Sequence, residues 1–177
     1  DPNGDALSYT WSVGRQAWML SENGAKASLK APATPGARTA VEVEVTDAEG
    51  KVARASTVVS TEPNQNPNIQ SVVANPSRVE PAGTVKLDVS AADADGDSLS
   101  YTWKAPKGGW IVTGNGATAD LTAPNAYGET GVITVTVTDP HGGQASGSVV
   151  VRTAENSAPV VSSLTATPQT AAPGGTT

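Results

Sequence analysis

The chain has 177 residues with 17 acidic and 11 basic side chains, and its formal net charge is −6 at pH 7. This acidic balance argues against a nucleic-acid partner, because binding to a phosphate backbone needs a basic surface. The lack of cysteine excludes disulfides, thiol catalysis and cysteine-bound metals, and no apolar stretch reaches the about 18 residues that predict a membrane span.

Alternating apolar residues predict β-strands along the chain. In residues 41–45 valines alternate with glutamates, and in residues 133–137 apolar residues alternate with threonines. Polar residues on every second position are expected to face solvent while their apolar neighbours face a core. In chain order, the predicted strands cover residues 7–11, 41–45, 69–74, 85–89, 99–103, 109–113, 117–121, 133–137 and 149–151.

The sequence repeats itself with a single offset of 92 residues and without a gap. The phrase DPNGDALSYTW at residues 1–11 returns as DADGDSLSYTW at residues 93–103, and Asn-Gly-Ala at residues 23–25 returns at residues 115–117. A fixed period of this kind indicates a tandem array of similar units.

The period divides the chain into three parts. Residues 1–63 are interpreted as a repeat that lacks its first strands, residues 64–155 as a complete repeat, and residues 156–177 as the start of a third. We therefore interpret the chain as a window on a longer array. The linkers NQNPN and NSAPV each contain a proline, which restricts the backbone and predicts semi-stiff joints between domains.

About seven short strands in each 92-residue repeat predict an immunoglobulin-like β-sandwich. Trp103 lies on the third long strand of the complete repeat, as the usual core tryptophan of that fold does, and Trp11 is its counterpart in the first repeat. The expected fold class is all-β, with tandem antiparallel β-sandwiches.

Two stretches of the complete repeat, VSAADADGDSLSYTW and VTVTDPHGGQASGSVVV, are followed by an Asn- and Pro-containing linker. With these motifs, the whole chain resembles bacterial extracellular repeats of the PKD, cadherin-like and Ig-like type. Such repeats occur in adhesins, surface proteins and multimodular secreted hydrolases. The resemblance implies a secreted or cell-surface protein in which neighbouring repeats of the same chain are the immediate partners.

Carboxylates and amides are expected to gather where the linker enters the complete repeat. Calcium takes six to eight oxygen ligands of this kind at flexible spacing, and the resemblance to cadherin-like repeats implies calcium between domains. The candidate ligands are Asp93, Asp95, Asp97, Asp139, Asn64 and Asn66, with Asp1, Asn3, Asp5 and Asp47 in the first repeat.

A metal-free turn explains the same residues. Aspartate, asparagine and glycine are the best turn formers, because their side chains bond to their own backbone or leave it free to bend. The phrase is not an EF-hand, since no glutamate follows at the twelfth position. The sequence therefore leaves calcium and a plain turn as two open interpretations.

No catalytic site is predicted. A glycosidase pair of carboxylates needs a cleft and a raised pKa on one member, and an exposed turn supplies neither. His141 is the single histidine, and the first repeat carries Glu49 in its place. No Ser–His–Asp arrangement can be built from these residues, so the chain is not expected to be an enzyme.

Trp18 and Trp110 stand at equivalent positions of the two repeats with different flanking residues. Their retention on different flanks favours a packing role at the edge of the sandwich. An exposed tryptophan stacks on a sugar ring or anchors an interface, so contact of these two residues with a ligand is the alternative.

Three hypotheses for function follow. The first is a non-enzymatic spacer or stalk repeat of a bacterial secreted or surface protein, with calcium as a stiffening ion at the joints. The second is an accessory module that binds polysaccharide or another glycan. In the third, residues 156–177 of one molecule complete the first repeat of another copy by strand addition, which would build a head-to-tail filament.

Overall fold

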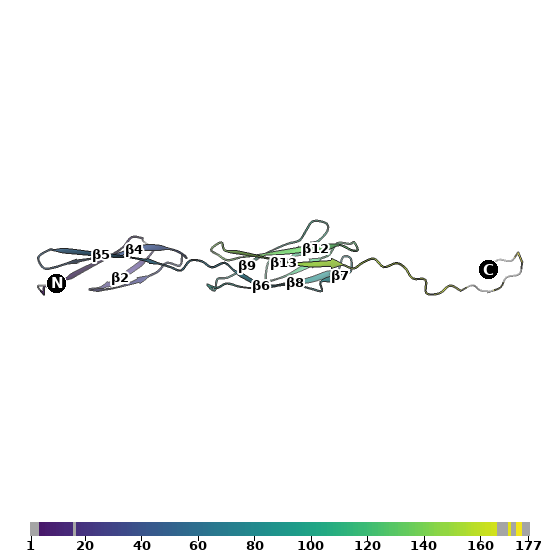
Figure 1. Cartoon of the computed structure of the whole chain (residues 1–177), viewed down its shortest axis with the longest axis horizontal. Helices are drawn as coiled ribbons and strands as arrows, with labels where there is room; N and C mark the ends of the chain where they lie inside the picture. Colours follow the sequence, from purple (N-terminus) through teal and green to yellow (C-terminus); the bar gives the residue numbers. More distant parts are fainter. Residues whose placement is uncertain (1–3, 16, 166–169, 171–172, 175–177) are drawn as a thin grey trace. The chain divides into compact units, whose positions relative to one another are not determined.

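The computed structural model describes residues 4–15, 17–165, 170 and 173–174. These residues form β-strands joined by turns, and no helix among them is long and apolar enough to cross a membrane. The all-β class predicted from the alternation is confirmed. Strands β1 to β5 lie in the first repeat and β6 to β13 in the complete one, and Figure 1 labels most of them.

The first sheet of the complete repeat has the strand order β10-β11-β8-β6. Strands β11 and β8 pair in antiparallel fashion, with Leu121 opposite Val85 and Ala119 opposite Leu87. The threonine and valine content of these strands suits a pleated surface that is buried on one side. The bounds are Asn68–Asn75 for β6, Thr84–Ala92 for β8, Ile111–Thr113 for β10 and Thr118–Thr122 for β11.

The second sheet has the strand order β7-β13-β12-β9. Strand β7 was not predicted, because it has two residues and so shows no alternation. It pairs in parallel with the end of β13, where Val79 lies opposite Thr153. The bounds are Arg78–Val79 for β7, Ser100–Lys104 for β9, Thr130–Thr138 for β12 and Gln144–Thr153 for β13.

The core of the complete repeat consists of aliphatic side chains that both sheets contribute. In β12 every second residue is buried, as the sequence pattern predicts, and the threonines between them are exposed or half-buried. Burial of each such side chain stabilises the fold by about 1.5–3 kcal/mol. The most deeply buried of these residues are Val85, Leu87, Leu121, Ile133, Val135, Val137 and Val151.

Two tryptophans complete this core. Trp103 on β9 is 8% exposed, and its Nε1 donates a hydrogen bond to the carbonyl oxygen of Gly116 over 3.0 Å. Trp110 is 6% exposed and lies against Gly131, where a Cβ would be only 2.7 Å from the indole ring. The lack of a side chain at Gly131 therefore leaves room for the Trp110 ring. The burial of Trp103 agrees with the packing role predicted for it.

The first repeat has a three-stranded sheet of order β1-β4-β5 and a separate hairpin of β2 and β3. Trp11 on β1 repeats the bond of its counterpart, since its Nε1 donates to the Gly24 carbonyl oxygen over 3.1 Å. The bounds are Ser8–Val13 for β1, Met19–Asn23 for β2, Lys26–Lys30 for β3, Arg38–Thr46 for β4 and Val52–Ser60 for β5.

The predicted repeat boundaries at residues 63/64 and 155/156 stay a prediction. In the last part of the chain, residues 156–165 form no strand. Residues 166–169, 171–172 and 175–177 lie outside the described residues. The predicted strand addition by residues 156–177 therefore stays a prediction as well.

Candidate metal centre

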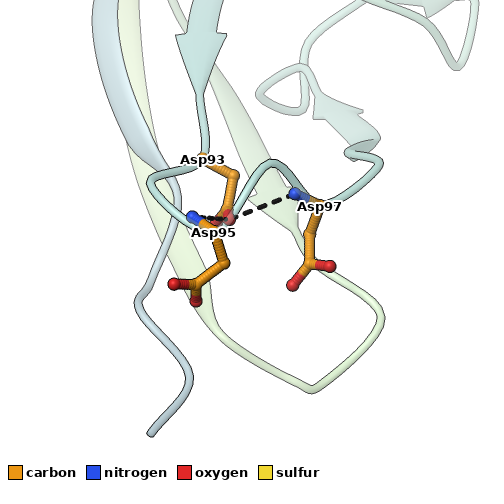
Figure 2. Close-up of side chains that lie close together, drawn as sticks. All are labelled: Asp93, Asp95 and Asp97. Atoms are coloured by element: carbon orange, nitrogen blue, oxygen red, sulfur yellow. Dashed lines mark hydrogen bonds between the residues drawn. The ribbon is translucent and has the colours of Figure 1, made fainter. Parts of the chain in front are cut away.

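The loop between β8 and β9 is shaped by the carboxylate of Asp93. Its Oδ1 accepts hydrogen bonds from the backbone N–H of Asp95 over 2.8 Å and of Asp97 over 3.3 Å (Figure 2). An aspartate that bonds to the backbone two residues on is the usual stabiliser of such a turn. The side chains of Asp95 and Asp97 are left to project from the loop in the same direction.

The three aspartates form one cluster. Each offers a carboxylate oxygen, and these oxygens lie within 4.8 Å of one another. Asp93 and Asp97 are half-buried, whereas Asp95 is exposed. Three carboxylates this close repel one another unless a cation or hydrogen-bond donors compensate.

The turn between β12 and β13 is held by another carboxylate, which is buried. Asp139 is 5% exposed, and its Oδ1 accepts the backbone N–H groups of His141 over 2.7 Å and of Gly143 over 2.9 Å. Its backbone N–H in turn donates to the Gly143 carbonyl oxygen over 3.1 Å. These bonds close the turn in the way that the metal-free interpretation predicts.

The incoming linker is tied to both loops. Asn64 Nδ2 donates to Asp139 Oδ2 over 3.0 Å, and the backbone N–H of Gln65 donates to Asp95 Oδ2 over 2.7 Å. With these bonds both oxygens of the Asp139 carboxylate are engaged by donors. The structure thus places the linker, the Asp93 loop and the Asp139 turn together at one end of the complete repeat.

Gly143 is required by the closeness of this packing. A Cβ at this position would collide with the Asp139 carboxylate, and it would lie 2.7 Å from Asn66 Oδ1 and 2.9 Å from Asn64 Nδ2. Contacts below about 3.0 Å are not available to real Cβ atoms. The glycine therefore lets two linker amides approach the turn, and Asn66 joins the group for that reason.

Two oxygens at this end are not satisfied. Asn64 Oδ1 and Asp93 Oδ2 are buried, and neither has a hydrogen-bond partner in the part of the chain that the structure describes. A buried acceptor without a partner costs about 1–3 kcal/mol. Both atoms are hard oxygen donors of the kind that calcium binds.

The pKa of Asp139 is held below its ordinary value of 3.8. The hydrogen bond from the Asn64 amide is the largest cause, the backbone N–H groups of the turn add to it, and burial acts in the opposite direction. Hydrogen bonds that favour the charged form lower a carboxyl pKa. The carboxylate is therefore charged at neutral pH and tied to the linker in that form.

Acidification is expected to destabilise the complete repeat through Asp139. Because the folded-state pKa is depressed, the carboxylate contributes stability above the unfolded pKa, and this contribution is lost as the pH falls through the folded value. Melting temperatures in EDTA, from neutral pH to well below 3.8, measure the effect. Asp139→Asn should lower the melting temperature at neutral pH and flatten the acid limb. An acid limb as steep as that of the unaltered chain would contradict this role.

His141 adds a conditional charge to the cluster. Its Nε2 lies 3.8 Å from Asp97 Oδ2, a distance at which the pair attracts only when the histidine is protonated. The ring does not lie within hydrogen-bond distance of the carboxylate. The expectation that His141 is a turn residue fits this placement.

The comparisons with known proteins identify the family of the chain. The sequence profile described as "Bacterial Ig domain" matches residues 64–152, which is half of the chain. The chain belongs to the bacterial Ig domain family. Its complete repeat carries the match, and the aspartate cluster and the Asp139 turn lie within the matched residues.

Relatives of this bacterial Ig domain include a carbohydrate-active enzyme. "Chitinase A" of Pseudoalteromonas piscicida is 30% identical over 148 residues, which are 78% of this chain and 17% of the chitinase. A Saccharophagus degradans structure, described as a nucleoside hydrolase-related hypothetical protein associated with carbohydrate metabolism, is 27% identical with a TM-score of 0.43, covering 51% of this chain and 26% of that one. Drosophila N-cadherin EC1-4 is 13% identical with a TM-score of 0.40, covering 85% of this chain and 42% of that one.

In the first repeat of the Ig-domain chain, two of the four predicted ligands, Asp5 and Asp47, lie among the described residues. Asp47 closes its own turn, since its Oδ1 accepts the backbone N–H groups of Glu49 over 3.0 Å and of Lys51 over 2.7 Å. Asp5 is half-buried. Asp1 and Asn3 lie outside the described residues, so the predicted ligand set of the first repeat stays a prediction.

Trp18 and Trp110 are both buried, at 3% and 6% exposure. A stacked sugar needs an open ring face, and neither ring presents one. The burial agrees with the packing role, and the predicted contact with a glycan gains no support from the structure.

Sequence reasoning missed two participants in this Ig-domain site. Gln65 contributes only its backbone N–H, which no side-chain pattern reveals. Gly143 contributes the absence of a side chain, and the signal for it was present, because Lys51 stands at that position in the first repeat. A glycine replacing lysine where a linker arrives indicates a close approach of two segments.

Proposed function

We propose that the chain is a non-catalytic structural module of an extracellular bacterial protein, in which it serves as a spacer whose entering linker is fixed by calcium. The observation that carries this proposal is the fastening of the linker to its own domain. Asn64 bonds to Asp139, and Gln65 bonds to Asp95. A linker held at two points transmits the orientation of the domain to the segment before it, which is what a spacer requires.

The donor set supports calcium as the ion. Asp93, Asp95 and Asp97 would hold it, and Asn64 would add an amide oxygen, because Asp93 Oδ2 and Asn64 Oδ1 are the two buried oxygens without a partner. All these groups are hard oxygens, and calcium accepts such ligands in irregular geometry, whereas magnesium demands a near-ideal octahedron. Calcium when bound would supply positive charge that offsets the carboxylate repulsion.

The similarity to a chitinase supports the extracellular, accessory part of the proposal. The chain aligns with a part of a chitinase and spans 17% of that protein's length. A segment of this size beside a large enzyme is consistent with an accessory role outside the cell, where chitin is met. The proposal assigns no reaction to the chain.

Calorimetry of the 177-residue chain tests the calcium part of the proposal. A ligand that binds only the folded state stabilises it by about 2.7 kcal/mol when its free concentration is about 100 times its Kd. For a domain of 60–100 residues this raises Tm by roughly 4–8 °C per kcal/mol. We expect Tm to rise in calcium and to fall in EDTA, and an unchanged Tm would remove calcium from the account.

Binding to insoluble polysaccharide separates the spacer from the alternative glycan-binding module. Similarity to part of a chitinase is the observation that keeps this alternative in view. The spacer proposal predicts that the chain does not sediment with chitin or cellulose. Sedimentation of the unaltered chain would favour the glycan-binding module instead, and its loss in Trp110→Ala would implicate that ring only if the variant keeps the melting temperature of the unaltered chain.

A further inference from the structure

We propose that Asn115 is a site of spontaneous deamidation in the complete repeat, and that this reaction loosens the anchor of Trp103. The tripeptide Asn-Gly-Ala occurs in both repeats at equivalent positions, residues 23–25 and 115–117. The reacting Asn-Gly pair and the residue after it are therefore the same at the two sites, although the flanking residues differ (Glu22 and Lys26 against Gly114 and Thr118). We infer that the backbone that holds the tripeptide decides which asparagine reacts faster.

The reaction needs no enzyme and only water as co-reactant. The backbone nitrogen of Gly116 attacks the side-chain carbonyl carbon of Asn115, forms a new C–N bond and expels the amide nitrogen as ammonia. Water then opens the cyclic imide at one of its two carbonyl groups, which leaves aspartate or isoaspartate. A glycine as the following residue favours ring closure, because it has no side chain to hinder the approach, and asparagine is among the thermolabile residues.

The backbone around Asn115 is open to this attack. Residues 115–117 form bends outside any strand, and Asn115 is exposed. Among the described residues, neither the Asn115 side chain nor the Gly116 backbone nitrogen has a hydrogen-bond partner. A Cβ built at Gly116 would meet no atom closer than 4.0 Å, so the ring has room to form.

Asn23 is held differently. It is the last residue of β2 and pairs with Lys26 across the hairpin, so its backbone is fixed in an extended conformation by a ladder pair. Ring closure requires the backbone at the asparagine to rotate, and this rotation would break the pair. Asn23 should therefore react more slowly than Asn115 while the chain is folded.

The product matters because the next residue holds a core tryptophan. The Gly116 carbonyl oxygen accepts the bond from Trp103 Nε1 over 3.0 Å, and the neighbouring Ala117 carbonyl oxygen accepts the backbone N–H of Val89 over 2.8 Å. Isoaspartate inserts one methylene into the backbone directly before these two carbonyls. Both acceptors are displaced, and the tie between the β10–β11 bend and the core is weakened.

Mass spectrometry of the aged chain tests the reaction. After incubation of the folded 177-residue chain at mildly alkaline pH, chymotryptic cleavage after Trp110 and Leu121 isolates residues 111–121, and cleavage after Leu20 and Leu29 isolates residues 21–29; each peptide has one asparagine. We expect peptide 111–121 to gain aspartate and isoaspartate several-fold faster than peptide 21–29. The difference should shrink in denaturant, where the folded backbone no longer distinguishes the two Asn-Gly pairs. Equal rates in the folded chain, or no conversion of peptide 111–121, would overturn the proposal.

A second measurement tests the consequence. The indole N–H signal of Trp103 in nuclear magnetic resonance should split on ageing, with the new signal exchanging faster with solvent. Asn115→Gln, which forms the corresponding ring much more slowly, should keep a single signal over the same period. An unchanged Trp103 signal in a sample shown to contain isoaspartate would contradict the loosening of the anchor.

Discussion

Trp103→Ala is expected to destabilise the complete repeat by about 3–5 kcal/mol, the usual range for removal of a buried tryptophan. The side chain is 8% exposed and bonds to the Gly116 carbonyl oxygen, so the substitution leaves a cavity and an acceptor without its partner. This loss is a large share of the about 5–15 kcal/mol that holds a typical domain together. Denaturant unfolding, monitored through hydrogen exchange at the amides of β12, measures the loss of stability in this repeat alone.

Trp11→Ala in the first repeat is the matched control. Trp11 makes the same bond, to Gly24 over 3.1 Å, but its ring is half-buried. A smaller part of the Trp11 side-chain surface is removed from water on folding. The loss of stability should therefore be clearly smaller than that for Trp103→Ala. Equal losses for the two variants would show that burial in the complete repeat does not set the contribution of this tryptophan.

Gly143→Ala is expected to open the end of the complete repeat at which the linker enters. The new Cβ has no space between the Asp139 carboxylate and the amides of Asn64 and Asn66. Either the turn or the linker must move. Overpacking of this kind typically lowers the free energy of unfolding by about 1–3 kcal/mol, and we expect a loss of at least this size. The predicted result is a lower Tm together with faster exchange of the Gln65 amide, since its bond to Asp95 depends on the position of the linker.

Lys51→Ala is the control that measures how alanine itself affects stability at this turn position. Lys51 occupies the position of Gly143 in the first repeat, where its side chain is exposed and its backbone N–H bonds to Asp47. A surface substitution of this kind changes stability by no more than about 0.5 kcal/mol. If Gly143→Ala were equally neutral, the close packing of linker and turn would not contribute to stability.

The strands were predictable where alternation is long enough to be seen. Strand β12 shows the pattern over its whole length, because one face is buried in the core and the other faces water. Strand β7 could not be found this way, since two residues show no period, and its pairing with β13 depends on where the chain returns. The number of strands per repeat was therefore set by contacts distant in sequence as well as by local pattern.

The carboxylates of the candidate site were predictable from the sequence, but their hydrogen-bond partners were not. Asp93, Asp95 and Asp97 were expected to cluster, and the structure brings them together. Asp139 was expected as a fourth ligand, yet both of its oxygens accept hydrogen bonds from the turn and the linker. Backbone donors such as Gln65 leave no trace in the residue type, so sequence alone could not decide which carboxylates remain free.

The most direct measurement is isothermal titration of the calcium-free 177-residue chain with calcium, alongside the double variant Asp95→Asn/Asp97→Asn. These substitutions keep the size of the side chains but remove two charges from the cluster. The account predicts saturable binding in the unaltered chain and its loss in the double variant, with Asp88→Asn, an exposed aspartate outside the cluster, binding normally. No heat of binding in the unaltered chain, or binding that survives in the double variant, would contradict the account.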